Sequence, residues 1–225
     1  MALPHLIFDV NETLLDLASL DAPFARAFGD AAVRETWFRR LLALSLAATV
    51  TNRYVNFTTL AEAALTMVSE AAGITLGAGD RDAILHGMCE LRPHPEVRDA
   101  LARLRGAGFH LSTLTNSTLE AALAQLAYAD LNEFFEQVFS VDDIRRYKPH
   151  PDTYRMAAAK LGIEPGGMVL IAAHDWDVAG AMAAGSDAAF IARNGAVPNP
   201  LAPPPPIVGE DLSVVAEALI ARVAA

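Results

Sequence analysis

The chain has 225 residues, of which 53% are hydrophobic and 20% charged, and its formal net charge is −10 at pH 7. This composition is typical of a globular protein with a substantial core, built as one large domain or as a domain with an insertion. The negative charge argues against nucleic-acid binding, and no apolar stretch reaches the ~18 residues of a membrane span. The only cysteine, Cys89, cannot form an internal disulfide, and the first residues lack the pattern of a secretory leader. We therefore expect a cytoplasmic protein with neither nucleic-acid nor membrane partners.

The first predicted strand is a short apolar run, Leu6 to Phe8, which stops at the carboxylate of Asp9. An acidic side chain at the carboxyl end of a buried strand lies where open α/β sheets bind ligands. The same residue could equally cap a following helix. This stretch alone leaves both interpretations open.

Almost a hundred residues without a strand signal follow the first strand. Amphipathic helices are indicated within them, for example over 31–50 and 58–73. The segment is too long for a simple crossover, so we predict a helical cap domain inserted at 16–91. The core domain then comprises 1–15 and 92–225.

Strands and helices alternate after the cap, which is typical of a parallel sheet of βαβ units. The fold class is therefore α/β, with a doubly wound, Rossmann-like core. The proline-rich segment 194–207 is predicted to be a surface connector without regular structure, leading to a last helix at 211–224. Strands are predicted at 109–115, 137–141, 167–173 and 188–193, each preceded by a helix, at 95–108, 117–129, 151–162 and 177–185.

Polar side chains gather at the predicted carboxyl ends of these strands and in the loops that follow. Each of them alone would be read as a turn or cap residue. In a doubly wound sheet, however, these ends converge on one crevice, so together they predict a binding site. They are Asp9, Thr115, Asn116, Lys148, Tyr154, His174 and Asp177.

The order Asp9, Thr115-Asn116, Lys148-Pro149, Asp177 resembles the haloacid dehalogenase superfamily. The stretches "NRYVNF" (52–57), "YKPHPDTY" (147–154) and "WDVAGA" (176–181) are similar to its L-2-haloacid dehalogenase (type II) branch. The resemblance covers essentially the whole chain, cap included. It implies that Asp9 is a nucleophile.

Most members of this superfamily are phosphatases, which need a second Asp two residues after the nucleophile and an acidic cluster for Mg²⁺. Asn11 occupies the first of these positions, and Ala172-Ala173 stand where a "GD" pair is expected. The resemblance thus implies no metal site and no cofactor. A carboxylate nucleophile without metal suits displacement of halide from a 2-haloalkanoic acid through an ester on Asp9.

The resemblance also implies the roles of the remaining site residues. Lys148 would keep Asp9 ionised, Tyr154 would brace Lys148, and Asp177 would position the lysine or the hydrolytic water. Phe57 and Trp176 would form apolar walls of the site. Either aromatic could equally be a core residue, and for Phe57 the core role is the favoured interpretation. The branch commonly forms homodimers through the cap, which we expect here. Donors to the substrate and to the tetrahedral intermediate would be Thr13, Thr115 and Asn116, with Asn11 nearby.

The chain departs from the branch at several positions. Phe38 stands where a cap arginine receives the halide, and Arg39 follows, turned by about 100° along the helix. Asn11-Glu12 replace an aromatic residue followed by Gly. His174 replaces an amide, and it could donate to the leaving group, activate water, or be a structural residue satisfied by the backbone.

Three hypotheses follow. The first is a metal-independent hydrolase of short 2-haloalkanoic acids that gives 2-hydroxy acids and halide. The others are an Mg²⁺-dependent phosphatase with a reduced acid set and a non-catalytic homologue that binds a small acid.

Overall fold

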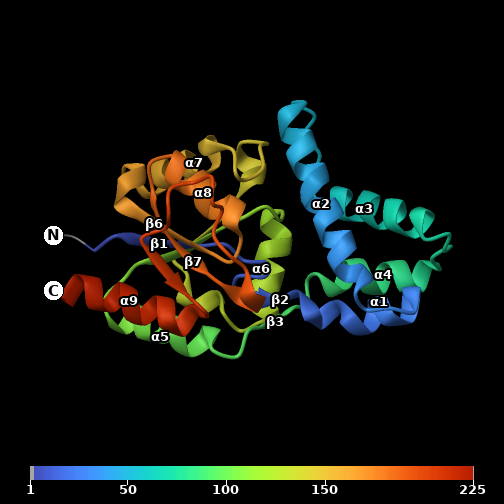
Figure 1. Ribbon diagram of the computed structural model, residues 1–225, viewed down its shortest axis with the longest axis horizontal. Helices are drawn as coiled ribbons and strands as arrows, with labels where there is room; N and C mark the ends of the chain where they lie inside the picture. The colour runs from blue at the N-terminus through green and yellow to red at the C-terminus, as the bar shows by residue number, and fades with distance from the viewer. Residues whose placement is uncertain (1–2, 225) are drawn as a thin grey trace.

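The computed structural model describes residues 3–224, which form a layered α/β part with a bundle of helices beside it (Figure 1). The sheet of the α/β part is entirely parallel, and the chain winds outward from β1 in both directions, as expected for a doubly wound sheet. The predicted α/β fold class is confirmed. In spatial order the strands are β5 (Gln137–Ser140), β4 (Leu111–Thr115), β1 (His5–Phe8), β6 (Met168–Ala172), β7 (Asp187–Ile191) and β8 (Ile207–Gly209).

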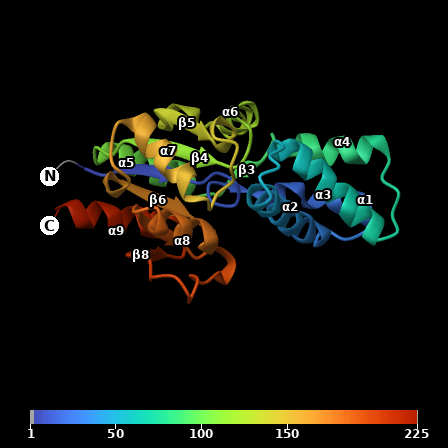
Figure 2. The ribbon, with the colours of Figure 1, turned by 90° about the horizontal axis from the view of Figure 1, so that it is seen from above.

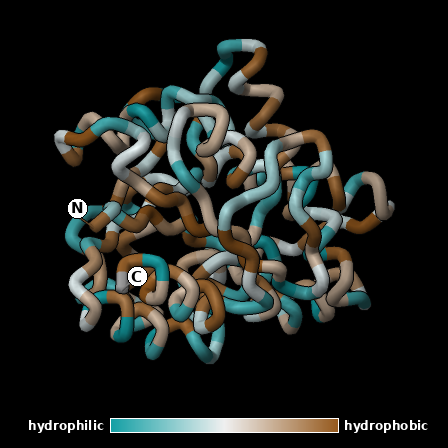
Figure 3. The backbone as a smooth tube through the Cα atoms, turned by 60° about the vertical axis from the view of Figure 1, so that its left-hand side comes forward, coloured by the Kyte–Doolittle hydropathy of each residue, from teal (hydrophilic) through white to brown (hydrophobic). Residues whose placement is uncertain are grey.

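The strands are buried on both faces, which explains why they read as continuous apolar runs. Leu6 and Phe8 of β1 pack with one set of helices, and Ile7 packs with the other. Figure 3 shows hydrophobic residues along the central strands, with hydrophilic residues mostly in the outer turns. The first set is α5 (Val97–Gly106), α6 (Leu119–Tyr128) and α9 (Leu212–Ala224), and the second is α7 (Pro151–Leu161) and α8 (Asp175–Ala183).

The helical bundle comes from the segment predicted as the cap. Its core contains the fully buried Trp37, which packs against Phe24 with ring centroids 5.3 Å apart and donates Nε1–H to the Ala61 carbonyl at 3.0 Å. The strands of the sheet run toward this bundle, so the carboxyl edge of the sheet faces it (Figure 2). The helices are α1 (Asp21–Phe28), α2 (Val33–Val50), α3 (Phe57–Ala71) and α4 (Ala78–Gly87).

The chain passes between the two parts through a small antiparallel pair that the sequence did not predict. Strand β2 (Leu15–Asp16) pairs with β3 (Arg92–Pro93) beside the predicted boundaries of the cap. A second contact joins the parts further along: Tyr147 stacks on Tyr54 with centroids 5.1 Å apart and donates its hydroxyl to the Val55 carbonyl at 2.6 Å. The connecting strands and this aromatic contact therefore both help to hold the bundle over the carboxyl edge.

The prediction that 194–207 has no regular structure is wrong at its end. Ile207 begins β8 and is paired with Ala189 of β7. The strand is only three residues long and lies at the sheet edge, where a preceding run of prolines costs no ladder hydrogen bonds. Within residues 3–224, no helix has the length and apolarity needed to cross a bilayer. Short 3-10 turns complete the fold at Leu17–Leu20, Asn132–Phe134, Val141–Asp143, Pro165–Gly167 and Arg193–Gly195.

Candidate active site

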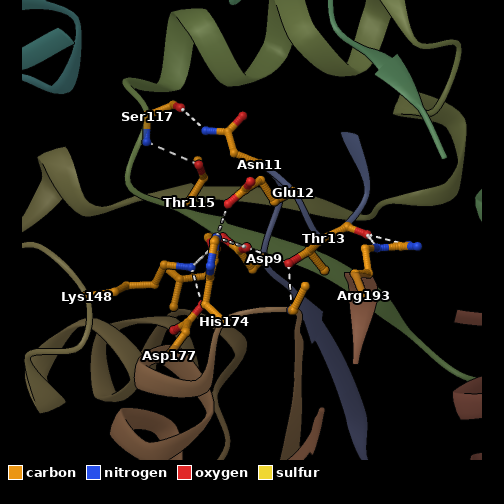
Figure 4. Close-up of polar contacts among 12 residues, drawn as sticks. Asp9, Asn11, Glu12, Thr13, Thr115, Ser117, Lys148, His174, Asp177 and Arg193 are labelled. Atoms are coloured by element: carbon orange, nitrogen blue, oxygen red, sulfur yellow. Dashed lines mark hydrogen bonds and ion pairs between the residues drawn. The ribbon is translucent and has the colours of Figure 1, made fainter. Parts of the chain in front are cut away.

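A fully buried lysine lies between two carboxylates at the carboxyl edge of the sheet (Figure 4). The Nζ of Lys148 donates to Oδ1 of Asp9 at 2.7 Å and to Oδ2 of Asp177 at 2.6 Å. Its third donor reaches the carbonyl of Leu114 at 2.9 Å, so all three N–H groups are used. Asp9 directly follows β1, Asp177 lies in the first turn of α8, and Lys148 comes from the loop before α7.

The charges of this cluster follow from burial and proximity. Burial alone would raise the pKa of Asp9, but the Lys148 ammonium beside it, together with the Thr13 hydroxyl, holds that pKa below its usual value. Burial alone would lower the pKa of Lys148, and the two carboxylates raise it instead. Burial and the charge of Asp9 raise the pKa of Asp177. Asp9 is thus the carboxylate that stays ionised most readily.

Two hydroxyl groups fix the orientation of the carboxylates. Thr13 Oγ1 donates to Oδ2 of Asp9 at 2.6 Å and accepts the backbone N–H of Ala173 at 3.0 Å. The Tyr154 hydroxyl donates to Oδ1 of Asp177 at 2.6 Å. Lys148 and Thr13 therefore fix the plane of the Asp9 carboxylate, because each donates a hydrogen bond to one of its two oxygens.

Helix α8 approaches the lysine loop so closely that only glycine fits at Gly180. A Cβ atom there would lie 2.4 Å from the Cβ of Pro149 and 2.7 Å from the hydroxyl of Tyr154. We expect Gly180→Ala to lower the free energy of unfolding by about 1–3 kcal/mol through overpacking, and to reduce turnover by moving Pro149 and Lys148. Gly79→Ala is the matched control, because nothing lies within 4 Å of a Cβ at that helical position. Urea unfolding of both variants measures the difference; equal stability would show that the contact is not tight.

Two further predicted residues line the loop after β4. Thr115 Oγ1 accepts the backbone N–H of Ser117 at 3.1 Å, a role that leaves its own hydroxyl hydrogen for another partner. Asn116 Oδ1 accepts the backbone N–H of Lys148 at 3.0 Å, so its amide NH₂ group can face a ligand. Both side chains are buried near the ionised cluster.

The imidazole of His174 lies above Asp9. Its Nε2 is 3.8 Å from Oδ2 of Asp9, and its ring stacks with that of Trp176, with centroids 4.9 Å apart, and with that of Phe38, with centroids 6.2 Å apart. The Trp176 ring also lies 6.0 Å from Nζ of Lys148. The aromatic side chains thus form an apolar wall beside the cluster.

Three other predicted site residues, Asn11, Arg39 and Phe57, make their contacts away from the charged cluster. The amide of Asn11 donates to Ser117 Oγ at 3.2 Å and accepts from Gln125 Nε2 at 3.0 Å, so it ties the loop after β1 to α6. Arg39 is exposed on the cap and pairs with Glu35, away from the cluster. Phe57 is buried against Tyr147.

The sequence did not single out Arg193 as a site residue. Its guanidinium donates to the carbonyl of Thr13 at 2.8 Å and pairs with Glu96 at 2.6 Å, which clamps the loop that carries Asp9 and Thr13. Arg193 lies just after β7, so its position at a strand end was the signal that could have found it.

Glu12 was likewise noted only as a departure from the branch. Its backbone has φ of 63°, in the left-handed region, and its Oε2 lies 3.7 Å from Nε2 of His174. Burial raises the pKa of Glu12, although the charges of His174 and Arg34 oppose the shift. Glu12 stands where the branch has glycine, the residue that most readily adopts this conformation, so that departure was the signal that could have found it.

In the part of the chain that the structure describes, no group of three or more His, Cys, Asp or Glu side chains is placed to hold a metal ion. Between Asp9 and Asp177 the positive charge is supplied by Lys148 instead. An ionised, oriented carboxylate at the edge of a donor-lined site is equipped for nucleophilic attack on a small electrophile.

Comparison with known proteins agrees with this geometry. The profile of the haloacid dehalogenase-like hydrolases matches residues 3–185. The chain is 31% identical over 189 residues, 83% of each protein, to (S)-2-haloacid dehalogenase 1 of Pseudomonas sp. (strain CBS-3). Its fold is similar to L-2-haloacid dehalogenase from Xanthobacter autotrophicus, with a TM-score of 0.90 and 24% identity over 97% of this chain and 98% of that one. A solved dehalogenase with an intermediate complex is 28% identical, with a TM-score of 0.91 over 97% of each chain. The chain therefore belongs to the haloacid dehalogenase-like hydrolase family.

Proposed function

We propose that this protein hydrolyses short 2-haloalkanoic acids to 2-hydroxy acids and halide, with Asp9 as the nucleophile and without a metal ion. The observation that carries the proposal is the buried Asp9–Lys148–Asp177 cluster, in which the Lys148 ammonium group keeps Asp9 ionised. The names of the relatives, (S)-2-haloacid dehalogenases, support the same substrate class.

In the first step, a carboxylate oxygen of Asp9 attacks C2 of the substrate from the side opposite the halogen. The carbon–halogen bond breaks, the halide leaves with the bonding pair, and C2 is inverted in an Asp9 ester. Thr115 and Asn116 would donate to the substrate carboxylate, while Trp176 and Phe38 would contact its apolar part. Halide needs no proton to leave, which suits a site where Asn11 is tied to Ser117 and Gln125.

In the second step, water adds to Cγ of Asp9 and the bond from Cγ to the substrate oxygen breaks. The oxygen that leaves in the 2-hydroxy acid comes from Asp9, and the water oxygen stays in the carboxylate. Thr13 and Lys148 would stabilise the charge of the tetrahedral intermediate, because they already donate to the two oxygens of Asp9.

Phe38 contributes no charge to the leaving halide. The loss of one charged donor to a developing anion costs about 3 kcal/mol of barrier, or roughly two orders of magnitude in rate. We therefore expect modest turnover that favours bromide over chloride as the leaving group.

The proposal is tested by measuring halide release in the presence of EDTA. The substrates are (S)- and (R)-2-chloropropionate, 2-bromopropionate and chloroacetate. We expect release from one enantiomer, undiminished by EDTA, and an inverted product. A single turnover in ¹⁸O-water should place the label in Asp9 rather than in the 2-hydroxy acid. Release that needs added Mg²⁺, or turnover of phosphate esters alone, would identify a phosphatase; no turnover of either class would leave a binding role.

The homodimer and the cytoplasmic location remain predictions. Exposed apolar side chains on the two long cap helices, Leu46 and Val50 on α2 and Met67 on α3, support a pairing of protomers through the cap.

A further inference from the structure

Glu12 adopts a backbone conformation that residues with a side chain rarely take. Its φ of 63° is left-handed. The conformation is held by its surroundings: the N–H of Glu12 donates to the Leu15 carbonyl at 2.8 Å, and the ring nitrogen Nε2 of His94 lies 3.2 Å from its carbonyl. Strained residues that the surrounding structure enforces cluster at functional sites, so the side chain of Glu12 merits a functional explanation.

The Glu12 side chain extends into the candidate site from the cap side. Its Oε2 lies 3.7 Å from Nε2 of His174, and the same nitrogen lies 3.8 Å from Oδ2 of Asp9. Both distances are longer than a direct hydrogen bond and lie within ion-pair range. One imidazole nitrogen therefore faces two carboxylates.

The rest of the His174 ring is enclosed by apolar groups. Trp176 and Phe38 both stack with it, and only 12% of the His174 side chain is exposed. The stacking fixes the plane of the ring and directs its Nε2 edge toward Asp9 and Glu12. A water molecule beside these three groups would meet two carboxylate acceptors and one imidazole nitrogen next to the nucleophile.

We propose that Asp9, Glu12 and His174 enclose the water that hydrolyses the Asp9 ester, with His174 as the general base and Glu12 as the residue that positions His174. This inference deepens the proposed function and rests on it. It assigns His174 to the second step rather than to the departure of the halide, because its nitrogen lies beside the attacking carboxylate, and backside displacement puts the halogen on the far side of C2.

The water oxygen forms a bond to Cγ of Asp9 while one of its protons moves to Nε2 of His174. The tetrahedral intermediate collapses, the bond from Cγ to the substrate oxygen breaks, and that oxygen takes the proton back from His174 as the 2-hydroxy acid leaves. The second water proton dissociates from the Asp9 carboxyl group, which returns to its ionised state beside Lys148.

The charges around His174 change during this cycle. Ester formation neutralises Asp9, so Glu12 becomes the carboxylate that faces Nε2, and it stabilises the imidazolium formed when water is deprotonated. Other charged groups nearby are Lys148, which donates to Asp9, and two cap residues, Arg34 and Glu35. The charge of Arg34 lowers the pKa of Glu12, and the charge of Glu35 raises it. Arg34 is itself anchored to Asp21 at 2.6 Å.

Rapid-quench kinetics with (S)-2-chloropropionate separates the two steps. In His174→Ala we expect a burst of about one halide per site, accumulation of the Asp9 ester in the mass spectrum, and a kcat lower by about 10²–10⁴-fold. Glu12→Gln should give the same burst and ester with a kcat lower by about 10²-fold, as expected for a misplaced base. Glu35→Gln, on the exposed face of α2, should behave as the wild type.

A stability measurement distinguishes this role from a structural one. Because burial raises the pKa of Glu12 in the folded state, its ionisation opposes folding once the pH exceeds its ordinary value of 4.5. Glu12→Gln should therefore gain stability relative to wild type at pH 8 and not at pH 4. Glu12→Gly, which also fits the left-handed φ, should fold at least as well as wild type and still accumulate ester.

Loss of the halide burst in either variant would overturn the inference, because it would place the residue in the first step. Unchanged kcat without ester accumulation would overturn it too. If the wild type released no halide from any haloacid, the proposed function would fail and this inference with it. If the wild type showed a burst and the variants had the same kinetics as the wild type, the proposed function would stand and the roles of Glu12 and His174 would be refuted.

Discussion

Lys148→Met is expected to lower the free energy of unfolding by about 3–5 kcal/mol and to abolish turnover. Removal of the ammonium leaves Asp9 and Asp177 facing each other in a buried site. Among residues 3–224, no other lysine or arginine pairs with either carboxylate, and the nearest ring nitrogen of His174 is 3.8 Å from Asp9. Two unscreened carboxylates of this kind repel each other, and protonation of one is the least costly response. The isosteric apolar chain fills the same volume, so the loss comes from charge and not from a cavity.

The control for this prediction is Lys160→Met. Lys160 lies at the exposed end of α7 and pairs with Asp143 on the surface, an ion pair that contributes at most about 1 kcal/mol. Urea unfolding at pH 7 should thus separate the two lysines by several kcal/mol. A Lys148→Met, Asp9→Asn double variant should recover part of the loss, because it removes one of the two opposed charges; full additivity of the two changes would contradict the coupling.

The pH dependence of this stabilisation follows from the directions of the pKa shifts. The raised pKa of Lys148 means that its contribution is complete below its ordinary value of 10.5 and is lost as the pH rises through the folded value. The lowered pKa of Asp9 means that its contribution is complete above its ordinary value of 3.8 and is lost as the pH falls through the folded value. The difference between wild type and Lys148→Met should therefore persist across the neutral range.

Asp9→Asn is expected to reduce halide release by at least about 10⁴-fold while the protein stays folded. The amide is a poor nucleophile, so no ester forms. Stability should remain within about 1 kcal/mol of wild type, since Lys148 keeps Asp177 as its counter-charge and the amide oxygen can still accept its hydrogen bond. The ionised cluster goes from one excess negative charge to balance.

Halide release and urea unfolding of Asp9→Asn, measured beside the exposed control Asp187→Asn, check this prediction. Mass spectrometry of the residue 9 peptide must show that the asparagine has not hydrolysed back to aspartate. Halide release above about 1% of the wild-type rate from intact Asp9→Asn would place the nucleophile elsewhere, and a large loss of stability would mean that the Asp9 charge is needed for folding.

The two variants together separate chemistry from structure. We expect Asp9→Asn to remove activity at little cost in stability, whereas Lys148→Met should lower both activity and stability. This difference is expected because one lysine balances two carboxylates, so Lys148 keeps a counter-charge when Asp9 is lost, but neither carboxylate keeps one when Lys148 is lost.

The sequence by itself determined the parallel α/β architecture, because each central strand is a short apolar run that is buried on both faces and bounded by a helix. It also placed Asp9, Thr115 and Asp177 at strand ends, which parallel strands bring to one edge. It missed β8, since three residues after a proline run carry no periodicity.

Only the tertiary structure decided which side chains meet. Lys148 lies 139 residues from Asp9 in the chain, and nothing local to either states that its ammonium bridges Asp9 and Asp177. The direction of a side chain depends on the neighbours it finds: Asn11 turned to Ser117 and Gln125, while Arg39 lies one helical position past the site-facing Phe38 and points to solvent. The left-handed backbone of Glu12, whose carboxylate lies near His174, is held by the Leu15 carbonyl and by His94, 82 residues away, and no propensity of glutamate predicts it.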